Sequence, residues 1–266
     1  MMSSCLWFSM RRAMVRWLLG LMGCLVLGAV GAEERNEQAQ QVLVGGYSFP
    51  PFVDGNAGVT IDLIAALNAV QSQFKFVFVP TSARRRYGDM ANGVFDVMFF
   101  ESMAWGWDKA TVEESRVYLK GDGEVYVALR KPGRDQAFFT NLAERTLIGV
   151  AGYHYGFANF NADPVELSKR FKITFADDAA AMLRMLLNER GEVGVVTRSY
   201  LQGYLLTQPQ LRDKLLVSKR FDQTYNHTFV VRKGSAVNAK AIEAIIGQLE
   251  KTGKLRALWA QHGIAK

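Results

Sequence analysis

Apolar residues along the chain cluster in two kinds of pattern, short unbroken runs and runs with helical spacing. Short runs rich in β-branched and aromatic residues predict buried strands, whereas apolar residues three and four positions apart predict helices that pack on a sheet. In the first half of the chain the two patterns alternate, which predicts a parallel sheet flanked by helices. The predicted strands are residues 42–47, 74–79, 94–100 and 124–130, and the predicted helices are residues 60–69 and 84–92.

A second cycle of the same kind begins after residues 131–133, where Lys-Pro-Gly interrupts the pattern. Asp177 and Asp178 are predicted to cap a helix in this cycle, and the apolar spacing after position 239 predicts a long or broken C-terminal helix that ends at Gly263. The predicted strands of this cycle are residues 146–150, 173–175, 193–197 and 227–231. Two cycles in a chain of 266 residues favour two α/β lobes over one large core, and the cleft between the lobes is the expected ligand site.

The N-terminus has the layout of a secretory signal peptide. Residues 1–16 carry three arginines, residues 17–32 are uncharged and end in small side chains, and two glutamates follow at once. We therefore predict cleavage after Ala32 and a mature protein in the periplasm. A lipoprotein site at Cys24 is the weaker interpretation, because it would leave the apolar residues 25–32 on the mature protein.

Charge and composition exclude several classes of function. Removal of the signal peptide takes three arginines and no acids from a chain of formal net charge +7, and apart from residues 84–86 the remaining basic residues are scattered. This pattern does not favour nucleic-acid binding. Both cysteines lie in the predicted signal peptide, and His154, His227 and His262 are far apart in the sequence, so we expect no disulfide, no metal and no cofactor.

Five segments of the predicted mature chain form a recognisable set. They are residues 47–52 (Tyr-Ser-Phe-Pro-Pro-Phe), 58–63 (Gly-Val-Thr-Ile-Asp-Leu), 93–97 (Gly-Val-Phe-Asp-Val), 146–152 (Thr-Leu-Ile-Gly-Val-Ala-Gly) and the tail 248–263. Each segment alone is common, but five in this order and spacing are not. Together they span nearly the whole mature chain and resemble solute-binding protein family 3, the amino-acid-binding components of bacterial ABC transporters.

The resemblance implies an α/β fold of the type II periplasmic-binding-protein kind, with two lobes that are each a mostly parallel sheet flanked by helices. Lobe 1 is expected to comprise residues 33–130 and 226–266, and lobe 2 is expected to comprise residues 131–225. Two crossing segments, near residues 124–131 and 226–233, would act as hinges that let the lobes close on a ligand.

Two of the family's usual ligand contacts are absent from this sequence. The resemblance implies an arginine that binds a carboxylate with two hydrogen bonds, but Asp108 or Lys109 stands at that position. It also implies an acid that accepts the ligand's amino group, and Arg198 and Ser199 stand there instead. The sequence therefore predicts a modified pocket and does not name the ligand.

The remaining candidates come from both predicted lobes. Glu101 ends a predicted strand at the edge where open α/β sheets bind ligands. The resemblance implies that an aromatic residue of the first loop stacks on the ligand. One arginine of residues 84–86 is a candidate replacement for the missing clamp, and His154 follows the turn of lobe 2. Packing within a lobe is the alternative for the aromatic candidates, and a solvated surface is the alternative for the polar ones. The predicted ligand-binding residues are Tyr47, Phe52, Arg84, Glu101, Trp105, Trp107, Tyr153, His154 and Arg198.

The leading hypothesis is a monomeric periplasmic protein that captures a small polar ligand, an amino acid or a related organic solute, and delivers it to an ABC permease. Contact with the membrane would then occur only through this partner, and we assign no catalytic residue. A ligand sensor that signals to a membrane protein is a second hypothesis. The third is an enzyme similar to cyclohexadienyl dehydratases, which resemble this fold, with Glu101 as general acid.

Overall fold

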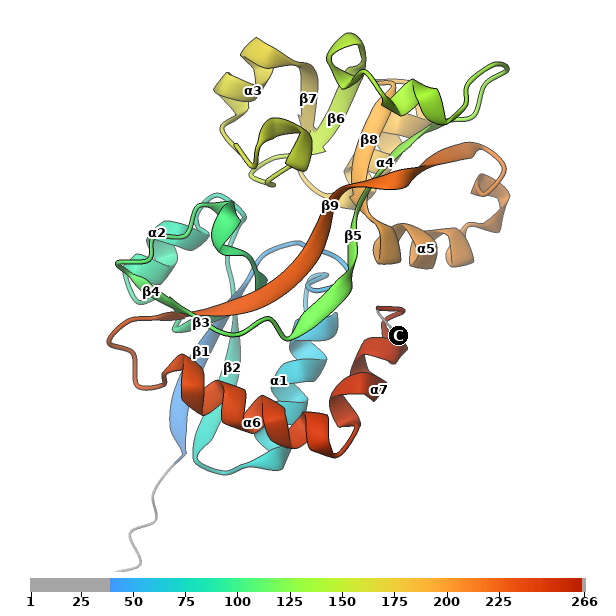
Figure 1. Ribbon diagram of the computed structural model, residues 1–266. Helices are drawn as coiled ribbons and strands as arrows, with labels where there is room; N and C mark the ends of the chain where they lie inside the picture. Colours follow the sequence, from blue (N-terminus) through green and yellow to red (C-terminus); the bar gives the residue numbers. More distant parts are fainter. Residues whose placement is uncertain (1–38, 265–266) are drawn as a thin grey trace, which may run out of the picture. The chain divides into compact units, whose positions relative to one another are not determined.

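The computed structural model describes residues 39–264, so the predicted signal peptide, with Cys5 and Cys24, lies outside the described residues. Strands and helices alternate over most of this range, as the sequence predicts (Figure 1). The strands are β1 (Gln40–Gly46), β2 (Phe74–Pro80), β3 (Val97–Glu101), β4 (Val112–Glu114), β5 (Leu119–Leu129), β6 (Thr146–Val150), β7 (Lys172–Ala176), β8 (Val193–Thr197) and β9 (Leu215–Arg232). The helices are α1 (Val59–Val70), α2 (Arg86–Ala91), α3 (Pro164–Arg170), α4 (Ala179–Leu187), α5 (Arg198–Thr207), α6 (Ala239–Lys251) and α7 (Lys254–Gln261).

One sheet forms around β1. This strand runs parallel to β2, with Val42 opposite Phe76, and parallel to β3, with Val44 opposite Val97. β9 pairs with the other edge of β3 in the antiparallel direction, and β4 also pairs with β9. The mostly parallel arrangement follows from the predicted alternation of strand and helix, because parallel neighbours need a crossover connection.

A second sheet forms around β6, which lies between β7 and β8 and is parallel to both. β5 pairs with β8 and with β9 in the antiparallel direction. The strand order is therefore β2-β1-β3-β9-β5-β8-β6-β7, and β9 belongs to both sheets. Figure 1 shows β9 as one long strand that passes from the lower sheet to the upper one.

Each sheet has its own hydrophobic core. One buried cluster surrounds the β1 sheet, whereas two further clusters cover the two faces of the β6 sheet. We refer to the part around the β1 sheet as lobe 1 and to the part around the β6 sheet as lobe 2. Along β5 the change of cluster falls between Leu119 and Val125, and along β9 it falls between Phe221 and Tyr225. These two short segments are the places where the chain crosses between cores.

Helix ends show which local predictions hold. Asp178 caps α4, because its side chain accepts a hydrogen bond from the Ala181 backbone N–H at 2.6 Å. α1 begins at Val59, one residue before the predicted helix, after Gly58 in a positive-φ conformation. The C-terminal helix is broken into α6 and α7 at Gly253, whose φ of 72° lies in the left-handed region that favours glycine.

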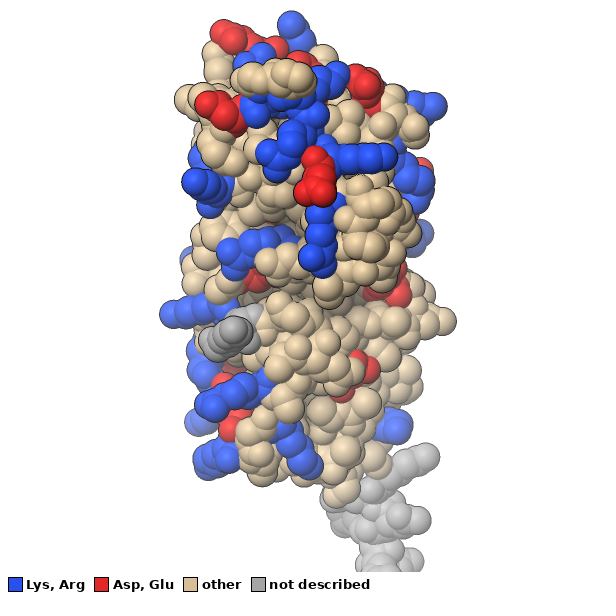
Figure 2. Space-filling view, turned by 90° about the vertical axis from the view of Figure 1, so that its right-hand side faces the viewer, with Lys and Arg blue, Asp and Glu red and all other residues tan. Residues whose placement is uncertain are grey.

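The surface carries scattered charge. On the face shown in Figure 2, Lys and Arg side chains lie in separate groups, with uncharged surface and some Asp and Glu between them. Within residues 39–264, no helix has the combination of length and apolar character that a membrane span requires. No group of three His, Cys, Asp or Glu side chains in the same range is arranged to hold a metal ion.

Candidate functional site

The candidate site lies where the loops that follow β1, β2 and β3 of lobe 1 meet the turn that follows β6 of lobe 2. Parallel strands bring these loops to one edge of each sheet, which is where open α/β sheets bind ligands. Gly152, in the β6 turn, has a φ of 83°, and a Cβ at this position would lie 2.8 Å from Cγ of Arg84. Only glycine therefore lets the two lobes approach each other so closely at this point.

Two tyrosines join the lobes by hydrogen bonds. The Tyr153 hydroxyl, from lobe 2, donates to the backbone carbonyl of Ser48 in lobe 1 at 2.6 Å. The Tyr87 hydroxyl, from lobe 1, lies 2.7 Å from Nε2 of His154 and also contacts the carbonyl of Trp105. Burial lowers the pKa of His154 to about 4, so its imidazole is neutral at pH 7. The lobes are therefore in contact, in a closed arrangement.

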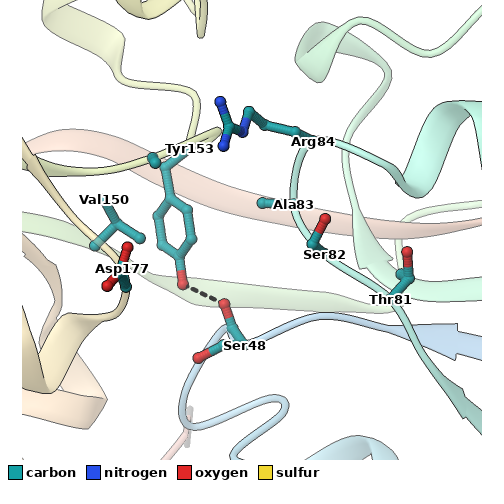
Figure 3. Close-up of a pocket in the computed structure, with 9 residues that line it drawn as sticks. Ser48, Thr81, Ser82, Ala83, Arg84, Val150, Tyr153 and Asp177 are labelled. Carbon is teal, nitrogen blue, oxygen red and sulfur yellow. Dashed lines mark hydrogen bonds between the residues drawn. The ribbon is translucent and has the colours of Figure 1, made fainter.

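A cavity of about 230 Å³, which we call the cleft cavity, opens beside the Tyr153 contact. Figure 3 shows Tyr153 reaching Ser48, with Arg84 and Asp177 on either side of it. The Arg84 and Asp177 side chains come from different lobes and carry opposite charges. The cavity is lined by Ser48, Thr81, Ser82, Ala83, Arg84, Val150, Ala151, Tyr153 and Asp177.

A second space, which we call the deep pocket, lies further in and is nearly filled. Its volume is about 10 Å³, close to the minimum of about 10–15 Å³ that one water molecule needs. Trp105 Nε1 donates to the Gln223 side chain at 3.1 Å, and the Gln223 amide donates to Glu124 at 2.7 Å. Tyr153 lines both spaces and so separates them. The deep pocket is lined by Tyr47, Phe49, Trp105, Glu124, Tyr153, His154 and Gln223.

A buried ion pair lies behind the Tyr47 ring, within lobe 1. The side chains of Arg86 and Glu101 are almost fully buried, and Arg86 Nε lies 3.5 Å from Glu101 Oε1. Trp107 Nε1 donates to the other carboxylate oxygen at 2.8 Å. The guanidinium carbon lies 4.7 Å from the Tyr47 ring centroid and 4.4 Å from that of Tyr87. Burial raises the pKa of Glu101, and the opposing effects of Arg86 and of the Trp107 hydrogen bond do not cancel this increase.

The structure brings some of the predicted site residues together and separates others. Tyr47, Trp105, Tyr153 and His154 line the deep pocket, and Arg84 lines the cleft cavity with Tyr153. Glu101 and Trp107 belong to the buried ion pair and line neither space. Phe52 is fully buried and packs against Phe49 and Phe100.

Arg198 lies at the crossing segments, away from both spaces. Its guanidinium donates to the Gly121 carbonyl at 2.9 Å, and its carbon lies 4.4 Å from the Phe221 ring centroid. The neighbouring Ser199 hydroxyl donates to Asp122 at 2.5 Å. These contacts join the start of α5 to the strands that connect the lobes.

Four polar residues of the site were missed by the sequence prediction. Glu124 had a signal, because it is a charged residue directly before the apolar part, residues 125–129, of a predicted strand. Arg86 had a weaker one, since it belongs to the run in which only Arg84 was chosen. Gln223 and Asp177 had none, because only the tertiary fold brings them beside the other lobe.

Comparisons with known proteins show the fold. No protein-family model matches the sequence, and no curated protein matches it. Among solved structures, the chain is similar to a histidine-kinase sensor domain that itself resembles periplasmic binding proteins, with a TM-score of 0.67 and 19% identity over 86% of this chain and 99% of that one.

It is also similar to the substrate-binding protein of an ABC uptake transporter from Streptococcus pneumoniae with bound histidine, with a TM-score of 0.66 and 21% identity over 83% and 91% of the two chains. A third similar structure is an ancestral amino-acid-binding protein described as a precursor of cyclohexadienyl dehydratase, with a TM-score of 0.64 and 20% identity over 83% and 94%. The chain thus has the two-lobed α/β fold of the periplasmic binding proteins. This confirms the predicted fold class, with the cleft between the lobes.

Proposed function

We propose that this protein is a solute-binding protein whose two lobes close around a small polar ligand. The observation that carries the proposal is the cleft cavity, which is lined from both lobes and bordered by the hydrogen bond between Tyr153 and Ser48. Contacts from one ligand to both lobes favour the closed state over the open one, so binding and closure are linked.

The lining of the cleft cavity supports a ligand of amino-acid size that carries both charges. At about 230 Å³ the cavity is smaller than the roughly 300–1,000 Å³ typical of sites for drug-sized molecules. Arg84 offers a guanidinium to an anionic group, and Asp177 offers a carboxylate to a cationic one. The hydroxyls of Ser48, Thr81 and Ser82 add polar contacts. The likeness to a histidine-bound uptake protein agrees with this ligand class.

Delivery to an ABC permease is the proposed role of the bound state, and export through the predicted signal peptide is part of it. In this proposal the exported protein is a monomer and begins at Glu33. N-terminal mass spectrometry of the purified protein tests the position of cleavage. We also propose the predicted lobe limits, residues 33–130 with 226–266 for lobe 1 and residues 131–225 for lobe 2.

Sensing is the second candidate, and the likeness to a histidine-kinase sensor domain favours it. Deletion of the gene distinguishes the two roles. Loss of ligand uptake supports transport, whereas normal uptake with a lost transcriptional response to the ligand supports sensing.

The dehydratase-like alternative requires Glu101 at the ligand. In the structure its carboxylate faces Arg86 and Trp107 and lines neither the cleft cavity nor the deep pocket. The test is whether the protein converts a bound compound into a product. If it does, and if Glu101→Gln abolishes this turnover but retains binding, the protein is an enzyme and the binding-protein proposal is wrong.

A thermal-shift screen with the 20 amino acids and small organic acids tests the proposed function. A ligand at 100 times its dissociation constant adds about 2.7 kcal/mol, which raises the melting temperature by roughly 5–10 °C. Arg84→Ala is expected to weaken binding at least tenfold. Arg85→Ala is the matched control, because Arg85 is exposed and lines neither space. Equal effects of the two variants, or no shift with any compound, contradict the proposed function.

A further inference from the structure

Glu124 is a buried carboxylate without a cation. The residue lies on β5 where the chain crosses between cores, is 2% exposed and lines the deep pocket. Its carboxylate accepts a hydrogen bond from the Gln223 amide, and no Lys, Arg or His of the described residues forms an ion pair with it. A buried carboxylate is costly unless it is paired or protonated. The deep pocket therefore offers an unfilled place for positive charge.

Aromatic side chains form the other walls of this pocket. Phe49 makes edge contacts with the Trp105 ring at 5.8 Å and with the Tyr153 ring at 5.6 Å between centroids. Tyr47 makes an edge contact with Tyr153 at 6.2 Å, so the rings meet at steep angles. Cations bind over aromatic faces within about 6 Å of the centroid. Several aromatic rings at steep angles to one another, together with one carboxylate, form a site that favours an ammonium group.

The nearby basic groups leave this place free. Arg86 lies behind the Tyr47 ring, does not line the deep pocket, and has Glu101 as its own counter-ion. His154 lines the pocket, but burial lowers its pKa to about 4, so it carries no charge at neutral pH. The Arg86 charge disfavours positive charge on His154, and the Glu101 counter-ion offsets part of this repulsion.

The Tyr153 ring lies between the two spaces, because it lines both. A ligand that enters by the cleft cavity and displaces the Tyr153 ring reaches the deep pocket. The Gln223 amide also donates to the His154 carbonyl, so Glu124 is exposed to the ligand once both this bond and the Trp105 bond to Gln223 are displaced. The other end of such a ligand remains beside Arg84.

We infer that the deep pocket is the subsite for an organic ammonium group, with Glu124 as its acceptor and Phe49, Trp105 and Tyr153 as its walls. The inference rests on the proposed function and narrows the ligand class. The ligand is a compound with an ammonium group at one end and a carboxylate at the other, which Arg84 binds. Glu124 thereby supplies the acceptor that is absent next to Arg198.

A proton is linked to this binding. Burial, and after it the neighbouring Asp222 carboxylate, raise the pKa of Glu124 to about 8. Asp122, Tyr153, Tyr155 and Tyr225 also face it, and none of these groups is a cation. Glu124 is therefore mostly protonated in the free protein at pH 7, and an ammonium ligand keeps it ionised. Binding at pH 7 is expected to release close to one proton.

The test compares ammonium compounds with uncharged isosteres by titration calorimetry. Glycine betaine is paired with 3,3-dimethylbutyrate, and β-alanine with butyrate, so that each pair differs mainly in the positive charge. The inference predicts at least tenfold tighter binding of one or both ammonium compounds than of its isostere. Runs in two buffers of different ionisation enthalpy measure the released proton.

Glu124→Gln is the variant that removes the acceptor while keeping its shape, and the exposed Glu144→Gln is its control. We expect the first to lose the ammonium preference and the proton release, and the second to keep both. Trp105→Leu, which removes a wall, is a second variant, expected to weaken glycine betaine more than 3,3-dimethylbutyrate if the quaternary compound is the one that binds.

The outcomes separate the inference from the proposed function. Equal binding of the two members of both pairs refutes the ammonium subsite, as does unchanged ammonium preference in Glu124→Gln, while the solute-binding function stands. Binding of an amino acid from the wider screen that Glu124→Gln leaves unchanged refutes the subsite in the same way. Failure of every compound in both experiments contradicts both proposals.

Discussion

Replacement of Arg86 by Met tests whether the buried ion pair between Arg86 and Glu101, which lies behind the Tyr47 ring, stabilises lobe 1. The change removes the cation that faces Glu101 and keeps most of the side-chain volume. Glu101 is then a fully buried carboxylate whose remaining partners are the Trp107 and Tyr47 side chains. Removal of one partner of a buried ion pair costs about 3–5 kcal/mol, and the lost stacking on the Tyr47 and Tyr87 rings adds about 1 kcal/mol.

The cost depends on pH. Without Arg86, nothing positive opposes the effect of burial, so the pKa of Glu101 rises further above its ordinary value of 4.5. A carboxyl with a raised folded-state pKa stabilises the fold below its unfolded-state pKa, and this contribution is lost as the pH rises through the folded-state value. We therefore expect Arg86→Met to be more damaging at pH 8 than at pH 5.

Urea unfolding followed by circular dichroism at the two pH values measures this. The double variant Arg86→Met with Glu101→Gln is expected to recover at least about 2 kcal/mol of the loss at pH 8, because no unpaired charge remains. Arg85→Met, at an exposed position, is expected to stay within about 0.5 kcal/mol of the wild type. Glu101→Gln alone completes the comparison. If the stability losses of Arg86→Met and Glu101→Gln simply add in the double variant, or if the pH does not change the cost of Arg86→Met, Arg86 does not stabilise lobe 1 by pairing with Glu101.

Three further predictions concern stability. The contribution of Glu124 to the free energy of unfolding is expected to fall with increasing pH by about 1 kcal/mol per unit between the ordinary carboxyl pKa and about 8, so the difference between the wild type and Glu124→Gln in urea titrations should fall with this slope. Gly152→Ala, with a φ of 83° and a clash across the cleft, should lower the melting temperature, whereas Gly203→Ala, a helical position with free space, should raise it slightly. Asp178→Ala should cost about 1 kcal/mol in urea unfolding through the lost cap of α4, and Asp177→Ala should leave stability unchanged and weaken ligand binding.

Local pattern was enough to predict most of the strands but not β4 or the full length of β9. The strands at residues 42–47 and 146–150 carry unbroken apolar runs, and both are central strands in the structure. β9 is much longer than the predicted strand 227–231. Polar residues such as Gln223 and Thr224, which show no strand pattern in the sequence, pair with β5. α5 was not predicted, since its sequence lacks a clear apolar stripe and contains Gly203.

The site could be predicted only in part, because its residues meet across the cleft. Trp105 and Tyr153 follow predicted strands and turns, and the structure places both in the deep pocket. Arg198 was chosen from its position in the family pattern, but the structure directs its guanidinium to the Gly121 carbonyl. The partnership of Glu124 with Gln223 depends on the register between β5 and β9, which no local pattern encodes.

The most direct test of ligand-induced closure is a distance measurement between the lobes. Both cysteines lie in residues 1–32, so spin labels at Val94→Cys in lobe 1 and Val165→Cys in lobe 2, two exposed positions, would be the only labels on the mature protein. The proposed function predicts a broad distance distribution without ligand. Saturation with the tightest-binding amino acid of the screen should convert it to one narrow peak at the shorter distance of the closed structure. A distribution that saturation leaves unchanged contradicts closure around the ligand.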